Sequence, residues 1–246
     1  MPNESTLGCA ADEPAFVEKT FSLTGVPATL ETQAAPGSPE PAGVQLQSDR
    51  PFNCLVVGVG GQGAVLASRL VAAACMDGGS FVRTAETIGM SQRGGSVATH
   101  VRVAPTARDL PTSMIPRHGA DLVLAFEPGE AVRAYGYLAR GGALVCSTRP
   151  LVPSAAATSG YDGRAQVDWL AEHVGPERFA ALDVQALEDA GLSPKCLNVL
   201  LLGAAVGLGA LPFGADELRR AMAELMKPKL IPMNERALEL GISLVG

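Results

Sequence analysis

The feature that most constrains this chain is a glycine-rich turn between an apolar run and a helical pattern. The apolar run, residues 54–57, is bounded by glycine and predicts a short buried strand. Gly58, Gly60 and Gly63 then follow the spacing G-x-G-x-x-G, and apolar residues continue at helical intervals from Val65. Strand, glycine turn and helix are typical of the first unit of a doubly wound α/β domain. The first turn of such a helix points free N–H groups at an anion.

The glycine turn alone does not identify a ligand, because a tight strand-to-helix turn that binds nothing uses the same residues. A dinucleotide-binding domain also needs an acidic residue about 20 positions later, at the end of the second strand, to hold the ribose. The second strand is predicted at residues 80–85, where Arg83 stands, and Glu86 comes late. Arg83 would suit a 2′-phosphate, but nothing else in the sequence supports NADP. The nicotinamide interpretation therefore lacks the acidic residue that would hold the ribose.

The composition excludes several classes of protein. The 246 residues carry a net charge of −6 without a basic patch, which argues against nucleic-acid binding. Hydrophobic residues make up 47% of the chain and charged residues 18%, below the usual fraction of roughly 25%, so much surface is buried against the chain itself or a partner. Five distant cysteines without C-x-x-C argue against a disulfide framework, a zinc site or an iron–sulfur cluster. We expect a reducing, cytoplasmic location, since no secretory signal is visible.

The chain is predicted to divide into a tail, residues 1–50, and a folded domain, residues 52–246. The tail is rich in proline and carries seven acidic and two basic residues, so it is predicted to be disordered. An alternative is that residues 16–23 form a strand on a partner. Within the domain, the apolar segment 199–211 is too short to span a bilayer and predicts a buried helix.

The remaining pattern alternates strands and helices, which predicts a mostly parallel sheet covered on both faces. His100 stands alone on one strand and is interpreted as structural. A long loop is expected at residues 150–164. The predicted strands are 96–103, 122–126, 143–146 and 179–184, and the predicted helices are 128–138, 167–173, 199–211, 216–226 and 234–244.

A second glycine-rich segment, residues 86–96, has the composition of a functional loop. It holds a carboxylate, an amide and a guanidinium among three glycines, and glycine lets a backbone approach a ligand closely. Arg93 offers a rigid fork of donors for a phosphate or carboxylate. The alternative is that Arg93 pairs with Glu86 and only shapes the loop. In a parallel sheet the loop would lie at the same edge as residues 58–63.

The two motifs together resemble a known family. A G-x-G-G-Q-G turn followed about 25 residues later by E-x-x-G-M-S-Q-R-G-G-S is similar to the gamma-type domain of 2-oxoacid:ferredoxin oxidoreductases. The spelling from Gly89 onward is closest to the small (beta) subunit of indolepyruvate:ferredoxin oxidoreductase. The resemblance continues in residues 198–204 and 234–241, and it covers residues 52–246. The tail, residues 1–50, departs from the family pattern, and the resemblance implies nothing about its role.

The resemblance implies a thiamine-dependent complex that decarboxylates aryl 2-oxoacids oxidatively, transfers the acyl group to coenzyme A and reduces ferredoxin. Because the chain lacks a thiamine motif and a cysteine cluster, a large (alpha) subunit is expected to hold thiamine diphosphate, Mg²⁺ and iron–sulfur clusters. No catalytic or metal-binding residue is expected in this chain. The residues expected to face coenzyme A or the oxoacid are Gly58, Gly60, Gly61, Gln62, Gly63, Glu86, Ser91, Gln92, Arg93, Gly94 and Gly95.

Three alternatives stay open at this point. The chain could be the gamma subunit of another 2-oxoacid:ferredoxin oxidoreductase. It could be a free-standing NAD(P)-binding reductase that uses the first glycine motif. It could also be an interaction module whose glycine loops only pack against a partner.

Overall fold

A computed structural model describes residues 50–89, 95–151 and 161–245. The chain divides into two compact units, Met1–Pro39 and Glu40–Gly246, and all described residues belong to the second. The predicted disordered tail therefore lies outside the described residues, apart from Arg50, and it stays a prediction.

The core of the domain is a six-stranded sheet with the order β2-β3-β1-β4-β5-β6. The pairs β1·β4, β4·β5 and β5·β6 are parallel, which confirms the prediction of a mostly parallel sheet. The strands are β1 (Phe52–Val59), β2 (Phe81–Ile88), β3 (Ser96–Ala104), β4 (Ala120–Ala125), β5 (Leu138–Ser147) and β6 (Phe179–Leu182).

One side of the sheet departs from a simple parallel arrangement. Strands β2 and β3 form an antiparallel hairpin, and β3 pairs antiparallel with β1. As a result β3 lies between β1 and β2, so the second strand of the chain is not a neighbour of the first. The predicted doubly wound, Rossmann-like α/β class holds, but β3 takes the place beside β1 that the second strand has in a dinucleotide-binding fold.

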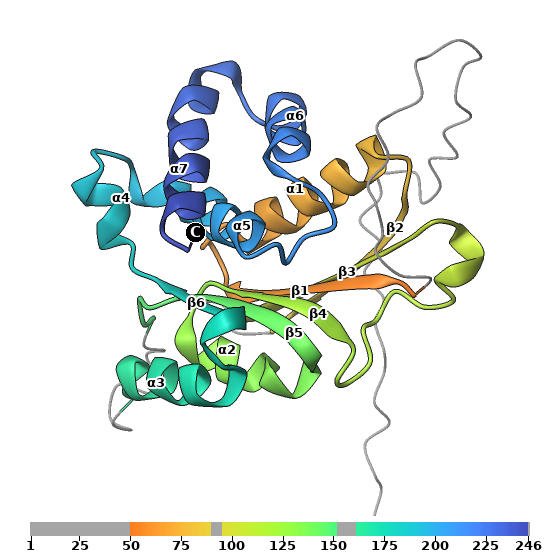
Figure 1. Ribbon diagram of the computed structural model, residues 1–246, viewed down its shortest axis with the longest axis horizontal. Helices are drawn as coiled ribbons and strands as arrows, with labels where there is room; N and C mark the ends of the chain where they lie inside the picture. Colours follow the sequence, from red (N-terminus) through yellow and green to blue (C-terminus); the bar gives the residue numbers. More distant parts are fainter. Residues whose placement is uncertain (1–49, 90–94, 152–160, 246) are drawn as a thin grey trace, which may run out of the picture. The chain divides into compact units, whose positions relative to one another are not determined.

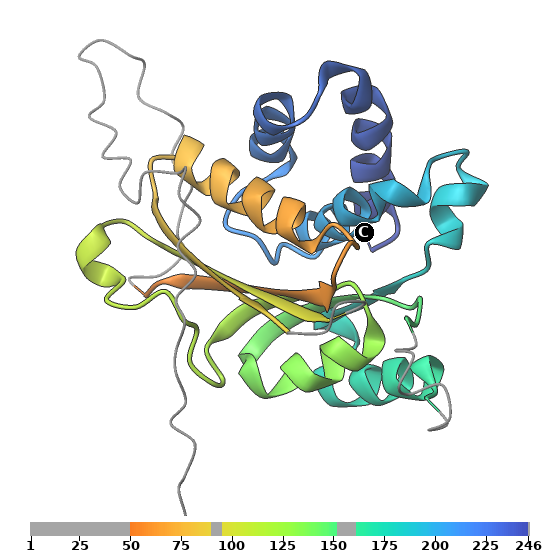
Figure 2. The same cartoon turned by 180° about the vertical axis from the view of Figure 1, so that it is seen from behind.

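Helices cover both faces of the sheet (Figures 1 and 2). Strand β1 shows why: Cys54 and Val56 point into one apolar cluster and Leu55 and Val57 into the other, as period-two alternation requires. One face carries α1 (Ala64–Asp77), α5 (Leu197–Gly207), α6 (Ala215–Leu225) and α7 (Ile231–Ser243), and the other carries α2 (Pro128–Ala134) and α3 (Gly163–Val174). A short helix, α4 (Gln185–Asp189), follows β6.

The segment between α2 and β5 differs from its prediction. The helix expected at residues 128–138 ends at Ala134, and the strand expected at 143–146 begins at Leu138. Gly141 and Gly142 therefore lie inside a strand, where the pairing with β4 shifts register. A Cβ on Gly142 would lie 2.7 Å from the carbonyl oxygen of Ala120, so the glycine lets two backbones approach.

Helices α5 and α7 pack with their backbones in contact. Val199 to Ala205 are buried all round, which confirms the prediction of a buried helix. A Cβ placed on Gly241 would lie 3.0 Å from the Cα of Gly203 and 2.9 Å from the backbone nitrogen of Ala204. In the part of the chain that the structure describes, no helix has the length and apolarity needed to cross a membrane.

Two buried polar side chains of β3 hold the loop that follows it. His100 accepts a hydrogen bond at Nδ1 from the backbone N–H of Ile115 at 3.2 Å, and burial lowers the pKa of its imidazole. Arg102 donates through Nε to Asn53 Oδ1 at 2.8 Å and through one terminal nitrogen to the carbonyl and hydroxyl oxygens of Thr112. His100 therefore makes structural contacts, in agreement with its interpretation from the sequence.

Candidate functional site at the carboxyl edge of the sheet

The first glycine motif forms the turn between β1 and α1, and the side chain of Gln62 in the motif stabilises this turn. A Cβ on Gly58 would lie 2.9 Å from the Cβ of Phe126, so only glycine lets β4 end this close to β1. Gln62 joins the two strand ends: its Oε1 accepts the N–H of Val59 at 2.7 Å, and its Nε2 donates to the carbonyl oxygen of Phe126 at 3.1 Å. Gln62 thus shapes the loop with both ends of its amide.

The start of α1 is open to a ligand. Gly61 and Gly63 both have φ of +92°, a conformation that favours glycine, and among the described residues no side chain caps the first turn. The unpaired N–H groups of that turn, together with the helix dipole, favour a negative group. Asn198, the second residue of α5, packs against Gly63, with its side-chain atoms 3.6–3.7 Å from the position of a Cβ there.

Asn198 is the most unusual polar residue near this turn. It is 4% exposed, and its Oδ1 is buried without a hydrogen-bond partner among the described residues. A buried amide oxygen without a partner costs about 1–3 kcal/mol, so this atom is a candidate contact for a bound molecule. In the sequence analysis this residue appears only as part of the family resemblance.

The hairpin brings the second glycine motif to the first. The backbone N–H of Gly60 donates to the carbonyl oxygen of Gly95 at 3.0 Å, so the two glycine segments touch at the same edge of the sheet, as predicted. Glu86 is a correction, since it lies in the exposed strand β2 rather than in the loop. Ser91, Gln92, Arg93 and Gly94 lie outside the described residues, and their predicted roles stay predictions.

Two buried carboxylates flank this edge, and the sequence analysis missed them. Glu127 follows β4, is 3% exposed, and caps α2 by accepting the N–H of Glu130 at 2.9 Å. Glu130 is 6% exposed and accepts the hydroxyl of Ser96 at 2.5 Å, at the start of β3 and next to Gly95. The Arg133 guanidinium pairs with the same carboxylate. The acid before Pro128 is a helix-cap signal that could have located Glu127.

Tyr161 contacts both Glu127 and the first turn of α2. Its hydroxyl donates to Glu127 Oε1 and accepts the backbone N–H of Gly129 at 3.0 Å. Burial, followed by the hydrogen bond to the carboxylate, raises the pKa of the Tyr161 hydroxyl. The tyrosine hydroxyl therefore keeps its proton and donates a hydrogen bond to Glu127. The carboxyl edge thus combines one open helix N-terminus with buried, fully engaged carboxylates beside it.

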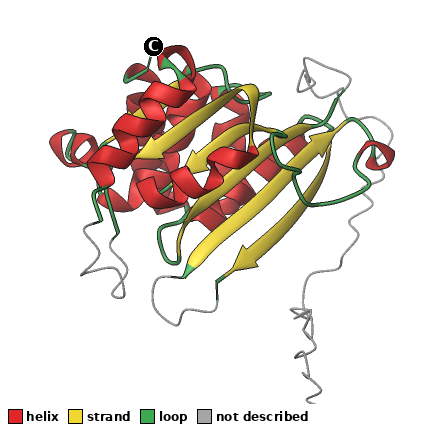
Figure 3. Cartoon of the chain, turned by 90° about the horizontal axis from the view of Figure 1, so that it is seen from below, coloured by secondary structure: helices red, strands yellow, loops and turns green. Residues whose placement is uncertain are grey.

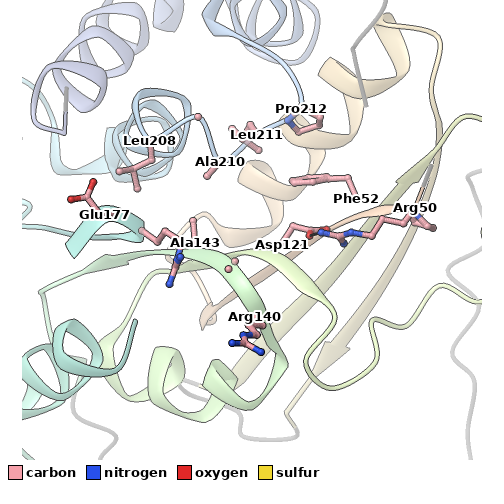
Figure 4. A pocket seen from close by; sticks show the side chains of 15 residues that line it. Arg50, Phe52, Asp121, Arg140, Ala143, Glu177, Leu208, Ala210, Leu211 and Pro212 are labelled. Carbon is pink, nitrogen blue, oxygen red and sulfur yellow. Dashed lines mark hydrogen bonds and ion pairs between the residues drawn. The ribbon is translucent and has the colours of Figure 1, made fainter. Parts of the chain in front are cut away.

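A separate cavity of about 290 Å³ lies at the opposite edge of the sheet (Figure 4). Its walls come from the amino ends of the strands, with Phe52 and Asp121, and from residues after α5, with Leu208 and Leu211. Asp121 is already occupied there, since it pairs with Arg50 at 2.5 Å and accepts the N–H of Asn53. None of the residues that the sequence predicted for the site lines this cavity.

We expect the substitution Gln62→Leu to lower the free energy of unfolding by about 1–3 kcal/mol. The leucine would leave the N–H of Val59 and the carbonyl of Phe126 without their partner. Chemical denaturation of the full chain measures this loss. The control Gln185→Leu removes an exposed amide, and a loss of equal size there would contradict the role of Gln62 in the loop.

Comparison with known proteins agrees with this geometry. The profile of the family described as pyruvate ferredoxin/flavodoxin oxidoreductase matches residues 53–244. The protein named indolepyruvate oxidoreductase subunit IorB of Archaeoglobus fulgidus is 38% identical over 192 residues, which cover 77% of this chain and 93% of that protein. The subunit of the same name from Pyrococcus horikoshii is 32% identical and covers 78% and 94%.

Solved structures share the fold. The gamma subunit of a keto/oxoacid ferredoxin oxidoreductase from Geobacter sulfurreducens matches with a TM-score of 0.54 and 19% identity, covering 79% of this chain and 98% of that one. The 2-oxoglutarate:ferredoxin oxidoreductase from Magnetococcus marinus, solved with 2-oxoglutarate, coenzyme A and succinyl-CoA bound, matches with a TM-score of 0.57 and 20% identity. That match covers 80% of this chain but only 31% of the longer one.

Proposed function

Because the chain belongs to the pyruvate ferredoxin/flavodoxin oxidoreductase family, we propose that it is the small (beta) subunit of an indolepyruvate:ferredoxin oxidoreductase. Such a complex decarboxylates aryl 2-oxoacids oxidatively to acyl-CoA and passes the electrons to ferredoxin. The names of the relatives at 32–38% identity, matched over nearly their whole length, support this assignment.

The proposal divides the work between two subunits. A large subunit would hold thiamine diphosphate with Mg²⁺ and the iron–sulfur clusters, which supply the decarboxylation chemistry and electron transfer. Within residues 50–89, 95–151 and 161–245, no cluster of His, Cys, Asp or Glu has the makeup of a metal site. The role of this chain would be to bind and orient an anionic co-substrate and to close its side of the site.

The observation that carries the assigned role is the side-chain oxygen of Asn198, which has no hydrogen-bond partner among the described residues and lies beside the open start of α1. Phosphate groups suit the free N–H groups of a helix N-terminus, and coenzyme A carries phosphates together with amide and hydroxyl groups that could donate to Asn198 Oδ1. The donor set therefore fits coenzyme A. Gly61 and Gly63 keep the turn free of side chains, so the ligand could approach the backbone.

The structure argues against the nicotinamide alternative. In a dinucleotide-binding domain the acidic residue at the end of the second strand reaches the ribose because that strand lies beside the first. Here β3 separates β2 from β1, and Glu86 points from an exposed border strand. A gamma subunit of a complex for another 2-oxoacid remains the second candidate, since the family as a whole shares this fold.

Co-expression of the full chain with a large subunit of an indolepyruvate oxidoreductase from the same genome tests the function. We expect a stable complex that oxidises indolepyruvate with coenzyme A and reduces ferredoxin. A complex that forms but prefers pyruvate or 2-oxoglutarate would support the second candidate. Failure of the two chains to associate would contradict the subunit assignment altogether.

The substitution Asn198→Asp tests the site within that complex. A carboxylate beside the start of α1 would repel a phosphate, so we expect the apparent KM for coenzyme A to rise on the order of tenfold while the KM for the oxoacid stays constant. Gln185→Glu adds the same charge at an exposed position and serves as the control. Equal KM values for coenzyme A in both variants would remove Asn198 from the site.

A further inference from the structure

The outer strand of the hairpin is open along its whole length in the described part of the chain. Strand β2 ends the strand order and has one neighbour, β3 (Figure 3). Five of its eight residues are exposed, and Ile88, at 67% exposure, is the most exposed of the large apolar side chains there. A long open strand with apolar residues is a template for pairing with another strand.

The hydrogen bonds of the hairpin decide which residues of β2 are available for such pairing. Gly89 donates its N–H to the carbonyl oxygen of Ser96 at 2.7 Å, in the same register that pairs Ala85 with His100. In an antiparallel ladder the residues that bond to one neighbour alternate with residues that face away from it. The backbone groups that point outward from the sheet are therefore those of Val82, Thr84, Glu86 and Ile88.

We propose that β2 pairs with β2 of a second copy of this chain, antiparallel about a two-fold axis at Ala85. This inference goes beyond the proposed function and does not depend on it. Only registers that oppose outward-facing residues satisfy the backbone, so the two-fold axis must pass beside a residue of β2 and not between two residues. An axis beside Arg83 or Glu86 would set two like charges directly opposite each other, and an axis nearer the end of the strand would pair fewer residues. An axis beside Thr84 or beside Ala85 remains.

The side chains favour the axis at Ala85. In that register Val82 lies opposite Ile88 of the second copy, so the most exposed apolar residue gains an apolar neighbour. Thr84 lies opposite Glu86, whose carboxylate can accept the threonine hydroxyl. Arg83 lies opposite Thr87, so no like charges face each other directly. An axis at Thr84 would instead place Val82 against Glu86 and leave Ile88 uncovered.

Sedimentation of the full chain over a wide concentration range tests the association, and hydrogen exchange tests the register. We expect a monomer–dimer equilibrium in which the amides of Val82, Thr84, Glu86 and Ile88 become protected as the dimer forms. A monomer at every concentration would overturn the proposal. So would concentration-independent protection of those four amides, because another part of the same chain would then cover the strand.

Two substitutions at the axis make the test specific. Ala85→Asp and Ala85→Lys would each place like charges directly opposite each other, so each variant alone should be monomeric. Mixed in equal amounts they should form a heterodimer, because the aspartate of one copy then meets the lysine of the other. Ala85→Ser keeps a small side chain and should dimerise like the wild type. Thermal melts confirm that each variant is folded, and a folded charged variant that still dimerises alone would overturn the register.

Discussion

The substitution Gly241→Ala is expected to lower the free energy of unfolding by about 3 kcal/mol. The new Cβ would meet the Cα of Gly203 at 3.0 Å and the backbone nitrogen of Ala204 at 2.9 Å. Main-chain atoms cannot rotate away as a side chain can, so α5 and α7 would have to move apart. That movement would loosen the leucines of α5 that fill the core.

Chemical denaturation of the full chain measures this loss of stability. One further variant tests the same contact, and another serves as the control. Gly203→Ala attacks the same contact from the other helix and should cost a similar amount, with less than additive loss in the double variant. Glu239→Ala adds the same residue type to an exposed position of α7 and should change stability by less than about 1 kcal/mol. Equal stability of Gly241→Ala and Glu239→Ala would mean that the helices are not in backbone contact.

The substitution Arg102→Met should also lower the free energy of unfolding by about 3 kcal/mol, because it removes the hydrogen bonds of a buried guanidinium. Arg102 is 9% exposed, and its hydrogen bonds go to uncharged oxygens of Asn53, Thr112 and Met114. Methionine fills much of the volume but donates nothing, so the buried oxygen of Asn53 and the carbonyls of the loop lose their donor. We expect the segment between β3 and β4 to be cleaved faster by proteases.

The fork of the guanidinium can be separated from its charge. Arg102→Lys keeps the charge but cannot reach Asn53 and Thr112 together, so its loss should be intermediate. Arg108 lies in the same loop region and is exposed, and Arg108→Met should leave both stability and the cleavage rate unchanged. An Arg102→Met variant as stable as Arg108→Met would show that the buried network does not anchor the loop.

The sequence by itself determined the glycine turn, the number and order of most elements, and the family. These features are local: a strand alternates with period two, a helix repeats near every third or fourth residue, and only glycine adopts the positive φ found at Gly61 and Gly63. The position of the two glycine motifs at the same edge of the sheet was also predicted, because both follow strands that end there, but their direct contact was not. The roles of residues 91–94 remain predictions from the sequence.

The tertiary structure alone decided which strands are neighbours and which polar residues are buried. A strand has the same pattern whether its neighbour is parallel or antiparallel, so nothing local shows that β3 enters between β1 and β2. Glu127, Glu130 and Asn198 are buried by elements that are distant in sequence. Residues of these types are equally common on a solvated surface, so the sequence around them does not show that they are buried. The full set of residues around the site is therefore known only from the packed structure, because the order of residues along the chain does not reveal which side chains become neighbours.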